Sequence, residues 1–353
     1  MENIGYFDGH NDVLLKLYSS KSQNIIKDFL EGNNYCHIDF KKIQKANFVG
    51  GFFAIFPPNV NQDFSNFSSK MEKKERYNFP LPEPISFDRA IDTTNKMISI
   101  LNQIIDTSEG KIILCKNGID VKSANENNKV AIILHIEGAE AINKDFSSLE
   151  KLYEAGLRSI GLVWSRSNIF AHGVPFSFPC LPDTGPGLTS LGKELVKICD
   201  ERKILIDLSH LNEKGFWDVA NLSTKPLIAT HSNSHQLCQH SRNLTNTQLK
   251  AIKESKGIVG INFATGFLRS DGQMTSDTSL DIIVEHCDFL LEFLGEEGVA
   301  IGSDFDGAVV PSKIKDLSGI NILKEHFLSK KYGTELVKKI FFKNWLNFLE
   351  KNL

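Results

Sequence analysis

The chain has 353 residues, of which 41% are hydrophobic and 24% charged, and its formal net charge is −3. A chain of this length and composition can form a sizeable hydrophobic core. Its small net charge gives no strong electrostatic attraction to nucleic acid or to an acidic membrane surface. No stretch reaches the ~18 apolar residues of a membrane span, and the first residues lack the pattern of a signal peptide. Because the six cysteines form no CxxC pair, we expect free thiols in a reducing compartment, and hence a cytoplasmic protein without a membrane partner.

Eight apolar, mostly β-branched runs follow one another along the chain. They are residues 4–7, 48–56, 130–136, 158–164, 203–208, 226–230, 257–263 and 298–302. Continuous apolar runs of this length are typical of strands that are buried on both faces.

Most of these runs are separated by helical patterns. Residues 188–199 and 280–294 show helical periodicity, and Ser147 with Glu150 and Thr245 with Gln248 match the capping-box pattern. Eightfold alternation of strand and helix predicts a (β/α)8 TIM barrel. A doubly wound open sheet would use the same alternation and stays an alternative at this point.

About 250 residues suffice for such a barrel, so roughly a hundred are left over. We assign them to an insertion at 57–84, a Gly/Pro-rich loop at 173–187 and a C-terminal helical part at 316–353. Since no linker or solenoid repeat is visible, we expect one domain over residues 1–353.

Metal-competent side chains follow five of the eight predicted strands. They are His10 and Asp12 after the first strand, Glu137 after the third, His210 after the fifth, His231 after the sixth and Asp304 after the eighth. Singly, each could cap a helix or bind loop amides. In a barrel, however, they would share the rim that carries active sites, and burying them together without a cation would be costly. Six ligands suit two metals about 3.5–4 Å apart, with Glu137 as the bridge because it is the one Glu of the set.

Seven short motifs, in order along the chain, make a resemblance specific. They are DGHND at 8–12, FVGGFFAIFPP at 48–58, HIEGAE at 135–140, IDLSH at 206–210, THS at 230–232, SRN at 241–243 and GSDFDG at 302–307. With these motifs the chain resembles the renal (membrane) dipeptidase family, the M19 metallopeptidases, and in particular its bacterial members. The resemblance implies a metallo-dependent hydrolase barrel of the amidohydrolase-like type.

The resemblance also implies two Zn²⁺ ions bridged by Glu137. His10, Asp12 and Glu137 would hold one, with Asp304 near or on it, and Glu137, His210 and His231 would hold the other. Arg242 matches the residue that binds the substrate's terminal carboxylate, and a planar guanidinium suits that role. Asn243 lies beside it in the SRN motif, and we count it among the substrate-binding residues. A homodimer is expected from the family alone.

One position departs from the pattern of the family's mammalian members, which carry a substrate-contacting His after the fourth strand. Trp164 stands there, and its indole N–H is a single donor. His172 could supply an imidazole instead, or could be an ordinary loop residue. We expect His235 and His240 to be exposed, and Asp306 could orient its loop or the Asp304 carboxylate.

The predicted function is zinc-dependent hydrolysis of dipeptides. A hydroxide bridging the metals would attack the scissile carbonyl, Glu137 would hold both metals, and Asp304 would move the proton to the leaving amine. The loops at 57–84 and 173–187 would shut the pocket on a short ligand. Two alternatives stay open: an amidohydrolase acting on another amide, a lactone or a cyclic amide, and an inactive metal-binding homologue.

Overall fold

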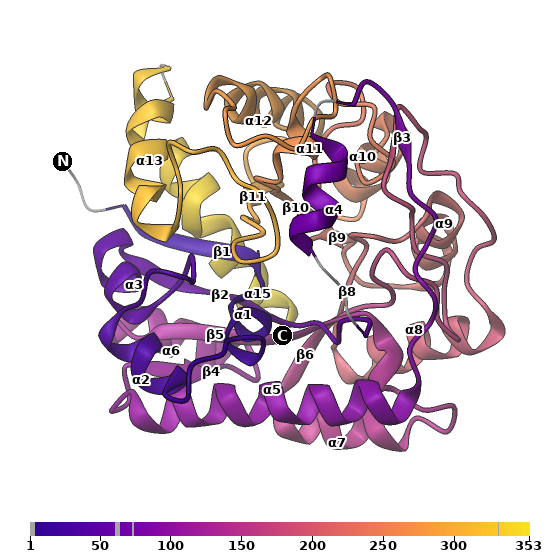
Figure 1. Cartoon of the computed structure of the whole chain (residues 1–353), viewed down its shortest axis with the longest axis horizontal. Helices are drawn as coiled ribbons and strands as arrows, with labels where there is room; N and C mark the ends of the chain where they lie inside the picture. The colour runs from indigo at the N-terminus through magenta and orange to yellow at the C-terminus, as the bar shows by residue number, and fades with distance from the viewer. Residues whose placement is uncertain (1–3, 61–63, 73, 331) are drawn as a thin grey trace.

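The computed structural model describes residues 4–60, 64–72, 74–330 and 332–353. At its centre, eight parallel strands pair in the order in which they follow one another along the chain (Figure 1). They are β1 (Tyr6–Asn11), β2 (Phe48–Ile55), β5 (Val130–Glu137), β6 (Leu157–Gly161), β8 (Leu205–Asp207), β9 (Ile228–Ala229), β10 (Ile258–Ile261) and β11 (Val299–Ile301). Each strand overlaps one of the eight apolar runs predicted from the sequence.

The first and last strands approach each other and nearly close the sheet. Asn11 forms an isolated parallel bridge with Phe305, and the backbone N–H of Asp304 donates to the carbonyl oxygen of His10 at 3.0 Å. A doubly wound open sheet would keep two free edges. The predicted (β/α)8 barrel is therefore confirmed, and the open-sheet alternative is wrong.

Three further short strands in the described residues were not predicted from the sequence, and none of them belongs to the ring of eight. β4 (Ile112–Leu114) pairs with β5 outside the ring. β3 (Tyr77–Asn78) and β7 (Ser177–Phe178) pair antiparallel with each other. This last pairing joins the 57–84 insertion to the 173–187 loop.

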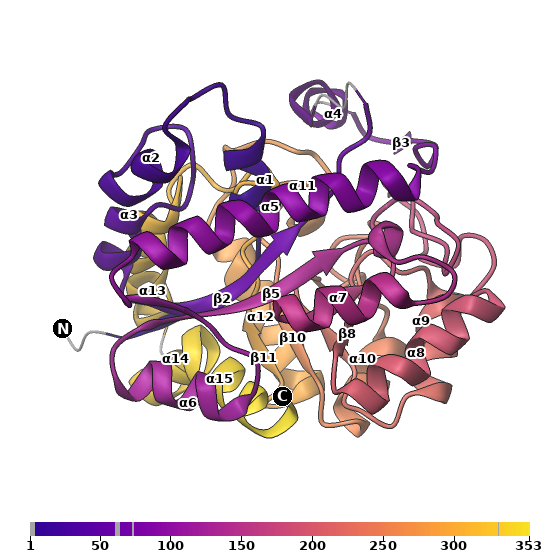
Figure 2. The same ribbon diagram turned by 90° about the horizontal axis from the view of Figure 1, so that it is seen from below.

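Helices surround the barrel, and Figure 2 shows α5 running along the outside of β2. The helices are α1 (Val13–Tyr18), α2 (Ile25–Glu31), α3 (Phe40–Ala46), α4 (Phe64–Met71), α5 (Phe87–Thr107), α6 (Gly118–Glu126), α7 (Ser147–Ala155), α8 (Ser190–Arg202), α9 (Glu213–Leu222), α10 (Asn246–Glu254), α11 (Thr265–Leu268), α12 (Asp281–Leu294), α13 (Ile320–Ser329), α14 (Thr334–Lys338) and α15 (Asn344–Asn352). Short turns of other helix types lie at Ala139–Ala141, Leu317–Gly319 and Lys339–Lys343. None of the helices in these described ranges has both the length and the apolar character that a membrane crossing requires.

The two predicted capping boxes have different outcomes. Thr245 and Gln248 form the expected reciprocal bonds at the start of α10. The box predicted at Ser147 is wrong, because Ser147 is the first residue of α7 and its hydroxyl donates to Asp145 instead. The carboxylate of Asp145, two residues earlier in the sequence, competes successfully for this hydroxyl.

The interior of the barrel is apolar at the end where the strands begin. Phe7, Phe52, Ile133 and Ile258 belong to one buried cluster that also contains Trp345 of α15. The Trp345 indole N–H donates to the carbonyl oxygen of Ile301 at 2.9 Å. The C-terminal helix therefore covers this end, and the polar residues gather at the other.

Candidate metal centre

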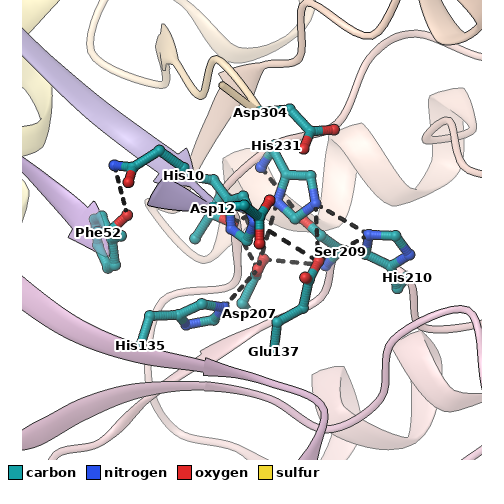
Figure 3. A network of polar contacts seen from close by, with 12 residues as sticks. His10, Asp12, Phe52, His135, Glu137, Asp207, Ser209, His210, His231 and Asp304 are labelled. Carbon is teal, nitrogen blue, oxygen red and sulfur yellow. Dashed lines mark hydrogen bonds and ion pairs between the residues drawn. The ribbon is translucent and has the colours of Figure 1, made fainter. Parts of the chain in front are cut away.

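The carboxyl ends of β1, β5, β8, β9 and β11 bring six polar side chains together, as the sequence predicted. The six are His10, Asp12, Glu137, His210, His231 and Asp304, and all are buried. Figure 3 shows His10, Asp12, His210 and His231 pointing towards the carboxylate of Glu137. Segments far apart in the sequence thus meet on one rim of the barrel.

One oxygen of Glu137 lies at the centre of this group. Its Oε1 atom is 3.0 Å from Nε2 of His210, 3.5 Å from Nε2 of His231 and 3.7 Å from Nε2 of His10. The two nitrogens of His210 and His231 are 3.1 Å apart, and Nε2 of His10 is 3.4 Å from Oδ2 of Asp12.

These separations fit a metal centre. Atoms bound at about 2.0–2.1 Å to one tetrahedral cation lie about 3.3 Å from each other. His10, Asp12 and Glu137 form one compact group of metal-competent atoms, and Glu137, His210 and His231 form another, so Glu137 is common to both. Both ring nitrogens of His10 and Oδ1 of Asp12 are buried without a hydrogen bond among the described residues. A cation would satisfy one His10 nitrogen and the Asp12 oxygen, since neutral imidazole and carboxylate are good ligands.

Asp304 stands slightly apart from these two groups. It belongs to none of the compact groups in the described ranges, and its Oδ2 accepts a hydrogen bond from Nδ2 of Asn262 at 3.0 Å. Its predicted role as a metal ligand therefore stays a prediction. Its φ of 59° lies in the left-handed region, as does the φ of 66° at His210, a conformation that non-glycine residues adopt where function or packing demands it.

Hydroxyl groups orient two of the imidazoles from behind. Ser165 Oγ lies 2.9 Å from Nδ1 of His210, and Thr230 Oγ1 lies 2.9 Å from Nδ1 of His231. Contacts of this kind fix the ring and leave Nε2 free to face the centre.

Sequence reasoning missed two buried polar residues beneath the centre, Asp207 and His135. Asp207 accepts bonds from the backbone N–H groups of Ser209 and Thr230 at 3.0 and 2.8 Å, and its Oδ2 is 3.9 Å from Nδ1 of His231. Nε2 of His135 is 3.8 Å from the same oxygen. Asp207 also forms a third compact group with His10 and His231. The sequence did contain a signal for Asp207, because an acidic residue inside an apolar strand requires buried partners.

Protonation in this cluster reflects both burial and charge. Burial raises the pKa of Glu137 well above its usual value, and Asp12 and Asp304 raise it further. For His10, burial opposes protonation, but Glu137 and Asp12 raise its pKa to about 10. Burial holds the pKa values of His210 and His231 well below normal. The neighbouring acids thus favour a proton on His10, and a bound cation would replace that proton.

A cavity of about 220 Å³ opens above the six residues. Asp12, Glu137, His210 and Asp304 form its floor, and Phe56, Trp164, Phe176 and Phe267 form its aromatic walls. Ser68 of the 57–84 insertion and Phe176 of the 173–187 loop both line it. Both segments thus contribute to the cavity wall, and their predicted closure over a short ligand stays a prediction.

Trp164 lines this cavity, whereas Arg242 does not. Trp164 forms part of the wall, with its ring centroid 5.9 Å from that of His210. Arg242 lies behind Phe267, with its Cζ 5.5 Å from the ring centroid, and donates to the carbonyl oxygen of His231 at 3.0 Å. Burial lowers the pKa of Arg242 to about 10, so the guanidinium stays charged at neutral pH. Its Nε has no hydrogen-bond partner within the part of the chain that the structure describes.

The amide nitrogen of Asn243 is engaged by the protein itself. Its amide nitrogen donates to the carbonyl oxygens of Cys238 and Phe267 at 2.9 and 2.8 Å. These bonds connect the loop that carries Arg242 to the wall residue Phe267. A substrate-binding role for Asn243 stays a prediction.

Three other histidines lie outside the centre. His172 contacts Ser167 Oγ through Nδ1 at 3.0 Å and does not line the cavity, so the structure favours its reading as a loop residue. His235 is half-buried. The expectation that His240 is exposed is wrong, because it is fully buried against Phe267 and accepts the backbone N–H of Arg242 on Nδ1 at 3.0 Å.

Comparison with known proteins agrees with this geometry. A sequence model of the membrane dipeptidase family (peptidase family M19) matches residues 1–352. A metallopeptidase of Rhodobacter sphaeroides, solved with a phosphinate mimic of the dipeptide L-Ala-D-Ala, is 42% identical, with a TM-score of 0.96 over 99% of each chain.

Curated sequences give the same result. An uncharacterised protein of Acinetobacter calcoaceticus is 42% identical over 292 residues, which is 82% of this chain and 90% of the relative. An uncharacterised dipeptidase of Schizosaccharomyces pombe is 26% identical over 321 residues, 89% of this chain and 71% of the relative. With the family match over nearly the whole length, the chain belongs to the membrane dipeptidase family, peptidase family M19, a family of metal-dependent dipeptidases.

Proposed function

We propose that this protein is a binuclear zinc dipeptidase that hydrolyses dipeptides with a free C-terminal carboxylate. The observation that carries the proposal is the position of Glu137, whose carboxylate belongs to both compact groups of metal-competent atoms at the floor of the cavity. A carboxylate shared in this way is suited to hold two cations close together.

In this proposal His10, Asp12 and Glu137 hold one cation, and Glu137, His210 and His231 hold the other. Zinc is our choice because two imidazoles and a carboxylate form a usual catalytic zinc set. When bound, the pair supplies a Lewis acid for the scissile carbonyl and a water of lowered pKa.

The remaining chemistry belongs to side chains of the cavity. Asp304 lines the cavity, and burial and Asp12 raise the pKa of its carboxyl. A carboxylate with a raised pKa accepts a proton from the attacking water more readily, and it can return this proton to the leaving amine. Asn262 holds one Asp304 oxygen at 3.0 Å and so fixes the direction of the other.

The substrate's length follows from Arg242 and from the size of the cavity. A buried guanidinium near Glu137 and Asp304 offers a site for a terminal carboxylate. A cavity of about 220 Å³ accommodates a short peptide. Because the carboxylate would lie one residue beyond the scissile bond, dipeptides fit and longer peptides do not. A homodimer and a cytoplasmic location complete the proposal, and size-exclusion chromatography tests the first of these.

The direct test is a dipeptide panel with metal quantification on the same preparation. The panel includes L-Ala-L-Ala and L-Ala-D-Ala, because the related Rhodobacter sphaeroides structure carries a mimic of the latter. We expect hydrolysis of free dipeptides, about two metals per chain, and little hydrolysis of tripeptides or lactones. Preferential hydrolysis of lactones or cyclic amides would reject the dipeptidase in favour of another amidohydrolase.

A further inference from the structure

The cavity continues into a second hollow, a more open groove of about 450 Å³. Lys16, Asp306 and Gly307 line both spaces. The groove adds polar walls from Ser69, Thr275 and Ser276, whereas the cavity walls are largely aromatic. A ligand in the cavity can therefore extend one polar side chain into the groove.

Lys16 stands at the junction of the two spaces. It lies on α1, one helical turn after Asp12, and its backbone N–H donates to the carbonyl oxygen of Asp12 at 3.0 Å. The start of α1 thus fixes the position of Lys16 relative to a candidate metal ligand. Its side chain is exposed and makes no ion pair with any carboxylate in the described ranges.

The other titratable groups at the junction are satisfied or more remote. The carboxylate of Asp306 accepts the backbone N–H groups of His37 and Ile38 at 2.7 and 3.3 Å. Burial lowers the pKa of His37 to about 4, so this imidazole is neutral at pH 7. Glu72 lines the groove but not the cavity. The ammonium of Lys16 therefore makes no direct ion pair at the junction within the described residues, although burial raises the pKa of the nearby Asp306 carboxyl and the charge of Lys16 lowers it.

The orientation of a bound dipeptide determines which of its residues meets Lys16, and here the inference rests on the proposed function. Arg242 follows β9, whereas Lys16 follows β1, and β10 and β11 lie between them on the rim. A dipeptide whose carboxylate lies at Arg242 extends across the floor towards the loops after β1 and β11. Its N-terminal residue then lies beside the junction.

We propose that Lys16 determines substrate specificity by binding the carboxylate side chain of an acidic N-terminal residue. The favoured substrates are then dipeptides that begin with Glu or Asp. Because the ion pair is partly exposed, its effect is modest, and we expect a preference of about fivefold.

The experiment compares kcat/KM for Glu-Ala, Gln-Ala, Lys-Ala and Ala-Ala with the metal-loaded enzyme. Glu and Gln are nearly isosteric, so the ratio of Glu-Ala to Gln-Ala reports the charge alone. We expect a ratio of about five for the wild type and about one for Lys16→Gln. In Lys16→Glu the order should reverse, with Lys-Ala cleaved faster than Glu-Ala.

Lys129→Glu is the matched control, because Lys129 is an exposed lysine just before β5, at the other end of the barrel. This variant should keep the wild-type ratio. A wild-type ratio of one or less, or a ratio that Lys16→Gln leaves unchanged, overturns the role of Lys16 while hydrolysis of Ala-Ala upholds the dipeptidase. Hydrolysis of none of the four dipeptides overturns both proposals.

Discussion

The backbone N–H of Asp304 donates to the carbonyl oxygen of His10 at 3.0 Å. This bond joins the end of the last barrel strand to the end of the first, although the two residues lie near opposite ends of the chain. It places the Asp304 carboxylate next to the His10 and Asp12 pair. Gly307, whose N–H donates to the Asp304 carbonyl oxygen at 3.1 Å, completes this corner of the site.

Gly307→Ala should disrupt this corner without unfolding the protein. An added methyl group would overlap Oδ2 of Asp12 and Oδ1 of Asp304, which are buried and have little room to move. Misplacing catalytic groups by about 1 Å can cost ~10²-fold in rate, and we expect a loss of this size in kcat/KM. Gly333→Ala is the control, since a methyl group there meets no described atom within 4 Å. Equal activity of the two variants would contradict the close contact.

Asp304→Asn should keep both metals and lose most turnover. The amide preserves the shape of the side chain but cannot accept a proton, so kcat should fall by about 10²–10⁴-fold. Steady-state kinetics and metal analysis of one sample separate the two effects. Near wild-type kcat would exclude Asp304 as the proton carrier, and loss of metal would indicate that it is a ligand.

Arg242→Met should weaken the binding of substrates that end in a free carboxylate. Removing one partner of a buried charge pair costs several kcal/mol, so KM for Ala-Ala should rise by about 100-fold. An Ala-Ala analogue with a blocked carboxyl group lacks the charge that Arg242 would bind, so its KM should change little. If KM rises equally for both substrates, the carboxylate-binding role assigned to Arg242 is wrong.

His286→Gln should flatten the dependence of stability on pH. His286 accepts the backbone N–H of Ser234 on Nδ1 at 3.2 Å, and its Nε2 lies 2.9 Å from the carbonyl oxygen of Leu268. Burial lowers its pKa to about 4, whereas the unfolded chain takes up this proton near pH 6.5. The free energy of unfolding should therefore decrease as the pH falls from about 6.5 to 4, by up to about 3 kcal/mol from this residue.

Glutamine can replace both hydrogen bonds of His286 but does not titrate in this range. Denaturant unfolding of the wild type and the variant at pH 7 and pH 4.5 measures the difference. The stability advantage of the wild type should shrink at the lower pH. Parallel pH profiles of the two proteins would show that His286 takes up its proton equally in both states.

The sequence predicted the barrel well because its strands are buried on both faces and therefore read as continuous apolar runs. Since all strands are parallel, their carboxyl ends share one rim, and this rule alone brings His10, Glu137 and His231 together. Short pairings such as Tyr77 with Phe178 leave no periodic signal. They form because two long insertions meet in space.

Other features depended on contacts that no local pattern records. His240 reads as a loop residue, yet Tyr77, Phe176 and Phe267 from three remote segments bury it. Asp207 lies within an apolar strand, and its importance emerges only from its position beneath His231.

The account depends most on two cations held around Glu137. The direct measurement is titration of metal-free enzyme with Zn²⁺, following bound metal and dipeptide hydrolysis together, in the wild type and in Glu137→Gln. We predict that wild-type activity saturates at two equivalents of Zn²⁺ per chain. The variant should bind at least one of these two ions more weakly, by a factor of about 100 or greater. Full activity in the metal-free enzyme, or unchanged binding of both equivalents by Glu137→Gln, would contradict the central claim.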